Sequence, residues 1–93
     1  MPRLIKTYIN VDVRFTPEGD MEPLSLRWKD EQVYEVDRIL DVGRHASNVG
    51  GNPGMIRYIC RIGGKERILY YEPGYGGYLA ETAKSRWFVE ERI

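Results

Sequence analysis

The pair Gly63-Gly64 constrains the fold of this chain more than any other feature, because it separates two segments that alternate in polarity. Two consecutive glycines suit the tight turn of a β-hairpin, whose central residues need a positive φ that glycine adopts without steric cost. Segments 55–62 and 65–71 are therefore predicted to be paired antiparallel strands, with Ile62 opposite Lys65.

This register assigns every side chain of the hairpin to one of two faces. Apolar and aromatic side chains gather on the face that we expect to be the core: Ile56, Tyr58, Cys60, Ile62, Leu69 and Tyr71. The other face pairs Ile59 with Ile68, Arg57 with Tyr70, and Arg61 with Glu66. That second face is amphipathic, and its pairs favour a cation–π contact and an ion pair.

Four more segments alternate with period two, which predicts half-buried strands. They are 8–15, 24–28, 33–42 and 86–93. The side chains expected to face the core are Ile9, Val11, Val13 and Phe15, then Leu24, Leu26 and Trp28, then Tyr34, Val36, Leu40 and Val42, and finally Trp87 and Val89. In 33–42 two residues break the pattern, because Ile39 falls on the outer face and Arg38 on the inner one.

The connections also follow from the sequence. Residues 16–20 are predicted to turn, and the glycine-rich stretch 43–54 to form a long loop. Between 24–28 and 33–42 we expect a connection of odd length, three or five residues, since that places Trp28 beside Tyr34 and Leu26 beside Val36. A two-residue loop would set leucines against acidic side chains instead.

Short strands separated by turns, without a long helix, predict an all-β and mainly antiparallel fold. A small SH3-like barrel of about five to six strands fits best. An OB-like barrel is the alternative, with residues 79–84 as its short helical turn. A chain of 93 residues is expected to form a single domain over 1–93.

Composition limits the classes of function. Lys+Arg and Asp+Glu both number 14, so the net charge is zero, whereas proteins that bind nucleic acid non-specifically usually carry a basic excess. The single cysteine excludes a disulfide within the chain. Because no signal-peptide pattern or long apolar run is present, we expect a cytoplasmic protein that does not enter the membrane.

The motifs that usually carry chemistry are absent from the sequence. Residues 73–78 lack the basic residue and the second aromatic residue of the RNA-binding submotif that they superficially match. His45 is the single histidine, and Cys60 falls on the core face, so neither has metal-binding partners. The acidic side chains on outward strand faces are Asp12, Glu35, Asp37 and Asp41. We therefore expect no catalytic residue, no metal and no cofactor.

What remains is a mixed surface of arginine, aliphatic and aromatic side chains, a composition found where proteins bind protein or nucleic acid. The residues expected to contact a partner are Arg57, Ile59, Arg61, Ile68 and Tyr70, rimmed by Tyr75 and Tyr78. Zero net charge favours a protein partner, with nucleic acid as the alternative. The sequence thus predicts a binding or adaptor module without enzymatic activity.

The order of aromatic motifs resembles a group of short bacterial domains of unknown function. The stretches that carry the resemblance are 24–28, 33–40, 56–61 and 86–89, so that it spans roughly residues 5–92 in order of elements. Some members of that group are encoded near proteins of the translesion DNA-polymerase type, which would imply a DNA-associated role. The resemblance transfers no catalytic residue to this chain.

Overall fold

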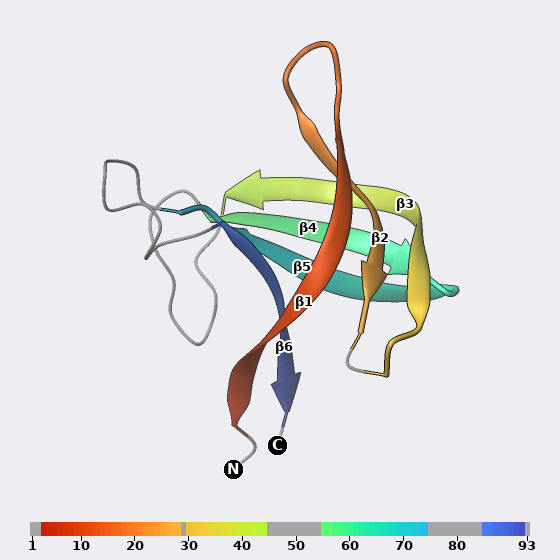
Figure 1. Ribbon diagram of the computed structural model, residues 1–93, viewed down its shortest axis with the longest axis vertical. Helices are drawn as coiled ribbons and strands as arrows, with labels where there is room; N and C mark the ends of the chain where they lie inside the picture. The colour runs from red at the N-terminus through yellow and green to blue at the C-terminus, as the bar shows by residue number, and fades with distance from the viewer. Residues whose placement is uncertain (1–2, 29, 45–54, 75–84, 93) are drawn as a thin grey trace.

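Six antiparallel strands form a closed barrel in the computed structural model of the chain (Figure 1). The structure describes residues 3–28, 30–44, 55–74 and 85–92. The strands are β1 (Leu4–Phe15), β2 (Met21–Arg27), β3 (Val33–Arg44), β4 (Ile56–Ile62), β5 (Lys65–Glu72) and β6 (Arg86–Arg92). The prediction of a small, mainly antiparallel all-β barrel is confirmed, and none of the described residues is helical.

The strands follow one another around the barrel in sequence order, and β6 pairs with β1 to close it. The order of the described strands contains no Greek-key crossover, which an OB-fold would contain, so the predicted SH3-like barrel fits them better than the OB-like alternative. The helical turn considered for 79–84 lies outside the described residues.

Two strands of 12 residues each, β1 and β3, bend and change partners along their length. Residues 4–9 of β1 pair with β6, and residues 10–15 pair with β2. Residues 33–35 of β3 pair with β2, whereas residues 36–44 pair with β4. Figure 1 shows the result, in which β3, β4 and β5 cross the direction of β1, β2 and β6. A sheet bent in this way encloses one core.

The hairpin at Gly63-Gly64 forms as predicted. Ile62 lies opposite Lys65, and the pairs Arg57–Tyr70, Ile59–Ile68 and Arg61–Glu66 follow in register. Gly63 and Gly64 have φ of 60° and 78°, the left-handed values that a primed two-residue turn requires.

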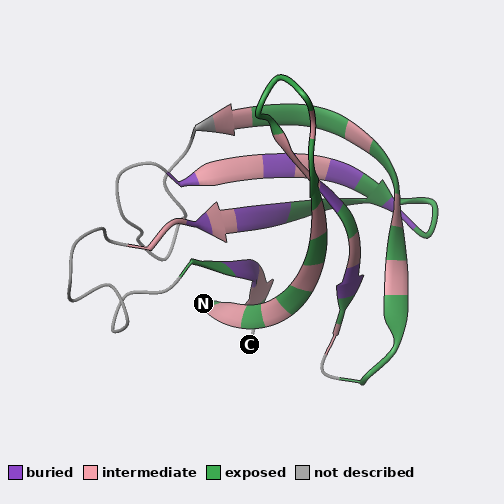
Figure 2. Ribbon diagram, turned by 45° about the horizontal axis from the view of Figure 1, so that its top comes forward, coloured by how far each residue is buried: buried purple, intermediate pink, exposed green. Residues whose placement is uncertain are grey.

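The main core fills the barrel interior (Figure 2). Its buried members are Leu26, Tyr58, Cys60, Ile62, Leu69, Trp87 and Val89. The half-buried side chains packed against them include Ile9, Val11, Val13, Trp28, Tyr34, Val36, Ile56 and Tyr71, all predicted to face inward. Alternation therefore identified most of this core correctly.

In β2 the predicted alternation between core-facing and outward side chains is wrong at one residue. The pairing of β1 with β2 shifts between Asp12 and Val13, so that Val11 faces Leu26 but Val13 faces Pro23. Leu24 is the extra residue of this bulge, and it is 44% exposed, contrary to the prediction that it faces the core. Pro23 is buried in its place.

A similar error occurs in β3, where the pairing with β4 shifts after Val36 and again after Ile39. The first shift turns Ile39 toward the core, and pairs Arg38 with the outward Arg61, so both apparent exceptions to the pattern disappear. Leu40, predicted to face inward, is the extra residue of the second shift and is 38% exposed. Each extra residue inverts the faces of the residues that follow it, so the second shift restores the original phase. Val42 accordingly lies opposite the buried Tyr58, but it is 51% exposed, contrary to the prediction.

Two further predictions need correction. Phe15 is 68% exposed, because it lies where the β1–β2 hairpin extends beyond the barrel (Figure 2). The connection between β2 and β3 spans residues 28–32, an odd length as predicted, but the register places Leu26, rather than Trp28, opposite Tyr34. Trp28 and Tyr34 still pack against the same core.

The Tyr58 hydroxyl joins β4 to the start of β2, a part of β2 that does not pair with β3. It donates a 2.7 Å hydrogen bond to the carbonyl oxygen of Met21, and the residue is only 2% exposed. Tyr58→Phe is expected to lower the free energy of unfolding by about 1.5 kcal/mol, because a carbonyl oxygen then loses its buried donor. Urea denaturation measures this as a lower midpoint at constant slope.

Tyr34→Phe is the matched control, since its hydroxyl donates to the exposed carboxylate of Asp30. We expect that change to cost much less than Tyr58→Phe, because the hydroxyl and its partner are exposed to solvent. Equal losses in the two variants would contradict a structural role for the Tyr58 hydrogen bond.

Candidate functional site

Four strands place one row of side chains across the outer face of the barrel. Tyr8 of β1 lies opposite Phe88 of β6, Phe88 opposite Tyr70 of β5, and Tyr70 opposite Arg57 of β4. The row includes two of the residues predicted to contact a partner, Arg57 and Tyr70. The sequence could not show that Tyr8 and Phe88 extend it, because the pairing of β1 with β6 joins distant parts of the chain.

Tyr70 is a buried member of this row, and its ring packs against the neighbouring side chains. Its ring stacks on Phe88 with centroids 5.0 Å apart, and the two side chains form a second buried cluster with Met55. The hydroxyl donates a 2.8 Å hydrogen bond to Glu90. Burial, together with this hydrogen bond to Glu90, raises the pKa of Tyr70 to about 12. With 3% of its surface exposed, Tyr70 orders the neighbouring residues but offers little area to a partner.

The aliphatic part of the predicted surface lies beside this row. Ile68 is 40% exposed and lies opposite the half-buried Ile59. Arg57 is half-buried, and its buried Nε has no hydrogen-bond partner among the residues that the structure describes. Arg61 is exposed and lies opposite Glu66. The structure therefore brings Arg57, Ile59, Arg61, Ile68 and Tyr70 together on adjoining strands. The predicted rim residues Tyr75 and Tyr78 lie outside the described residues, as does His45.

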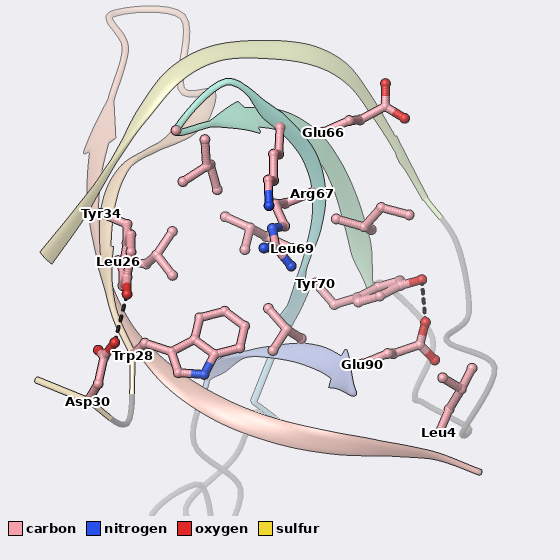
Figure 3. A pocket seen from close by; sticks show the side chains of 15 residues that line it. Leu4, Leu26, Trp28, Asp30, Tyr34, Glu66, Arg67, Leu69, Tyr70 and Glu90 are labelled. Atoms are coloured by element: carbon pink, nitrogen blue, oxygen red, sulfur yellow. Dashed lines mark hydrogen bonds between the residues drawn. The ribbon is translucent and has the colours of Figure 1, made fainter. Parts of the chain in front are cut away.

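Beside Ile68 the barrel has an opening. Strand β5 pairs with β6 only through its last three residues, Tyr70–Glu72, and toward the Gly63-Gly64 turn the two strands diverge (Figure 1). A cavity of about 630 Å³ occupies this place. Its apolar lining comprises Leu4, Leu26, Trp28, Ile62, Ile68, Leu69 and Val89 (Figure 3). Leu26, Ile62, Leu69 and Val89 are buried members of the main core, so the cavity borders that core.

Arg67 points into this cavity from the inner face of β5 (Figure 3). Among the described residues its guanidinium has no ion pair and no hydrogen bond. Across the cavity, the Tyr34 hydroxyl donates a 2.7 Å hydrogen bond to Asp30, which lowers the pKa of Asp30 and raises that of Tyr34. Glu66 and Glu90 also line this cavity, but no ion pair joins either of them to Arg67 among the described residues.

Sequence reasoning overlooked Arg67, although the signal was present. The hairpin register places it opposite Cys60, on the core face. A charged side chain at such a position either reaches solvent or faces an opening.

Glu72 is the centre of a polar network that joins three strands. Its carboxylate accepts hydrogen bonds from Lys6 Nζ at 2.8 Å, the Tyr8 hydroxyl at 3.1 Å and an Arg86 guanidinium nitrogen at 3.3 Å. The Arg86 guanidinium also lies 3.9 Å from the centroid of the Tyr8 ring. Burial would raise the pKa of Glu72, but Lys6, Tyr8 and Arg86 together lower it. Saturated by these partners, the carboxylate joins β1, β5 and β6.

The remaining described groups that could carry chemistry are Cys60 and the acidic side chains that could ligate a metal. Cys60 is fully buried on the core face, as the hairpin register predicts, and burial raises the pKa of its thiol to about 11. The described residues contain no group of three or more metal-ligating side chains. Nor do they form a helix with the length and hydropathy needed to cross a membrane.

Comparison with protein-family models, with curated proteins and with solved structures found no match to this chain.

Proposed function

We propose that this chain is a non-enzymatic binding module whose partner is a protein. The proposal rests on one observation: the exposed side chain of Ile68 lines an opening whose wall is apolar. An extended segment of a partner could cover Ile68 and fill the opening together. Apolar area removed from water would then supply the binding energy.

Charge supports a protein in preference to nucleic acid. The net charge is zero, and one arginine of this face, Arg61, lies opposite Glu66. Nucleic acids are held chiefly through phosphate contacts by a basic excess. The Tyr70 ring, which could have stacked on a base, is buried against Phe88.

Ile68→Asp tests the proposal. We expect it to reduce capture of the protein partner from a lysate at least about tenfold, because a carboxylate would be buried without a counterion at the contact. Val33→Asp is the matched control, since Val33 is a 55% exposed apolar side chain in a different strand, and capture should persist. Circular dichroism confirms that both variants remain folded.

Nuclease treatment and salt distinguish the two partner classes. Capture that survives nuclease and weakens little between low and high salt supports a protein partner. Capture that nuclease removes, or that falls steeply with salt, would indicate nucleic acid instead. Equal capture by the chain and its Ile68→Asp variant would refute this surface.

A further inference from the structure

The free edge of β5 has a defined hydrogen-bonding pattern. In a two-residue hairpin the residues flanking the turn exchange backbone hydrogen bonds, so the N–H and C=O of Lys65 point toward β4. Along an antiparallel strand this direction alternates with each residue. The backbone groups of Arg67 and Leu69 therefore also point toward β4, whereas those of Glu66 and Ile68 point away from it.

On the side away from β4, no described strand is paired with β5 at Glu66 and Ile68. The pairing of β5 with β6 begins only at Tyr70, where the same alternation directs the backbone groups toward Phe88. Two N–H donors and two C=O acceptors thus line the opening next to its apolar wall. An exposed row of this kind is a template for one more strand.

The side chains at this edge specify the chemistry of that strand. Lys65 and Arg67 both project to the inner face, Ile68 to the outer face. A strand opposite them would need acidic side chains at its inward positions and an aliphatic side chain opposite Ile68. A second copy of this chain would instead set Arg67 against Arg67 about a two-fold axis, which like charges oppose.

Building on the proposed protein-binding function, we infer that the partner contributes an extended acidic–aliphatic segment. It adds as a β-strand to Glu66 and Ile68 of β5 and places a carboxylate opposite Arg67. Main-chain hydrogen bonds supply affinity, and the alternating side chains supply selectivity. The inward-pointing charges that keep copies of the chain apart also select the acidic partner.

A displayed library of random peptides, each about eight residues long, provides the probe. The unmodified chain is expected to enrich peptides with acidic residues at alternate positions. When the Arg67→Glu variant is used for selection, the enriched peptides should carry basic residues at those positions. Selection of no peptide, or of peptides without alternation, would overturn the inference, while the Ile68→Asp comparison with Val33→Asp still decides the proposed function separately.

Proline substitution separates main-chain pairing from side-chain contact. Glu66→Pro removes an outward N–H that β4 does not use, and proline is tolerated at such edge positions. We expect Glu66→Pro to lower the affinity for the enriched peptides at least about tenfold. Glu66→Ala keeps the N–H, so its affinity should stay within about threefold of that of the unmodified chain. Equal effects of the two substitutions would refute strand addition and leave the protein-binding proposal intact.

Amide hydrogen exchange of the unmodified chain gives an answer that does not depend on folding of the proline variant. The amides of Glu66 and Ile68 should exchange fast in the free protein and slowly with the enriched peptide, while those of Arg67 and Leu69 should be protected in both states. Unchanged exchange at Glu66 and Ile68 on peptide binding would overturn the inference.

Discussion

Replacing Phe88 with alanine is expected to lower the free energy of unfolding by about 3–5 kcal/mol, a large share of the stability of so small a domain. Phe88 is fully buried on the outer side of the sheet. It stacks on Tyr70 at 5.0 Å, meets the edge of Tyr8 at 5.8 Å, and lies 4.8 Å from Lys6 Nζ. Removing the ring would empty the centre of the second cluster. Urea denaturation measures the loss directly.

Phe15→Ala is the control for this prediction. It deletes the same ring at a site that is 68% exposed, so we expect a change below about 0.5 kcal/mol. A loss in Phe88→Ala no larger than in Phe15→Ala would mean that the second cluster adds nothing to the stability of the barrel.

Glu72→Gln is expected to have the second-largest effect, a loss of about 2 kcal/mol. The variant keeps the size of the side chain but leaves Lys6 and Arg86 without the carboxylate that they share. Lys6 is the more enclosed of these partners, with 21% of its side chain exposed against 54% for Arg86, so most of the loss should come from Lys6. Thermal or urea unfolding at neutral pH measures it.

The same carboxylate predicts a dependence of stability on pH. The folded state lowers the pKa of Glu72 below its ordinary value of 4.5, so the carboxylate stabilises the fold fully above that pH. This contribution is lost as the pH falls below 4.5 and through the folded pKa. The Glu72→Gln variant should therefore differ most from the unmodified chain at neutral pH, and the difference should shrink in acid.

Glu22→Gln is the matched control, because Glu22 also accepts a short ion pair, from Arg14 at 2.6 Å, but between exposed side chains. It should cost less than about 0.5 kcal/mol, as surface pairs do. If the gap between Glu72→Gln and the unmodified chain persisted unchanged in acid, the ionised carboxylate could not be its source.

The sequence predicted the hairpin better than the other strands for a physical reason. Gly63-Gly64 fixes both the turn and the register of its flanking strands, so one local feature assigns the faces of β4 and β5. In β2 and β3 the bulges at Leu24 and after Val36 add a residue that no local composition announces. Beyond such a point the alternation is still regular, but its phase is reversed.

The candidate site was predictable to the extent that it depends on that hairpin. Arg57, Ile59, Arg61 and Ile68 share the predicted face because their register is local. The partners of Glu72 were not predictable, since Lys6 and Tyr8 lie 66 and 64 residues away in the chain. The opening beside β5 also depends on where β5 and β6 part, which is decided by the bend of the whole sheet.

The pairing of β1 with β6 joins residue 4 to residue 92. During synthesis the first strand therefore keeps one edge unpaired until residues 86–92 have left the ribosome. Contacts between such distant segments make folding slow compared with local hairpins. A nascent chain stalled before residue 86 would present the unprotected edges of both β1 and β5, and would depend on chaperones to avoid aggregation.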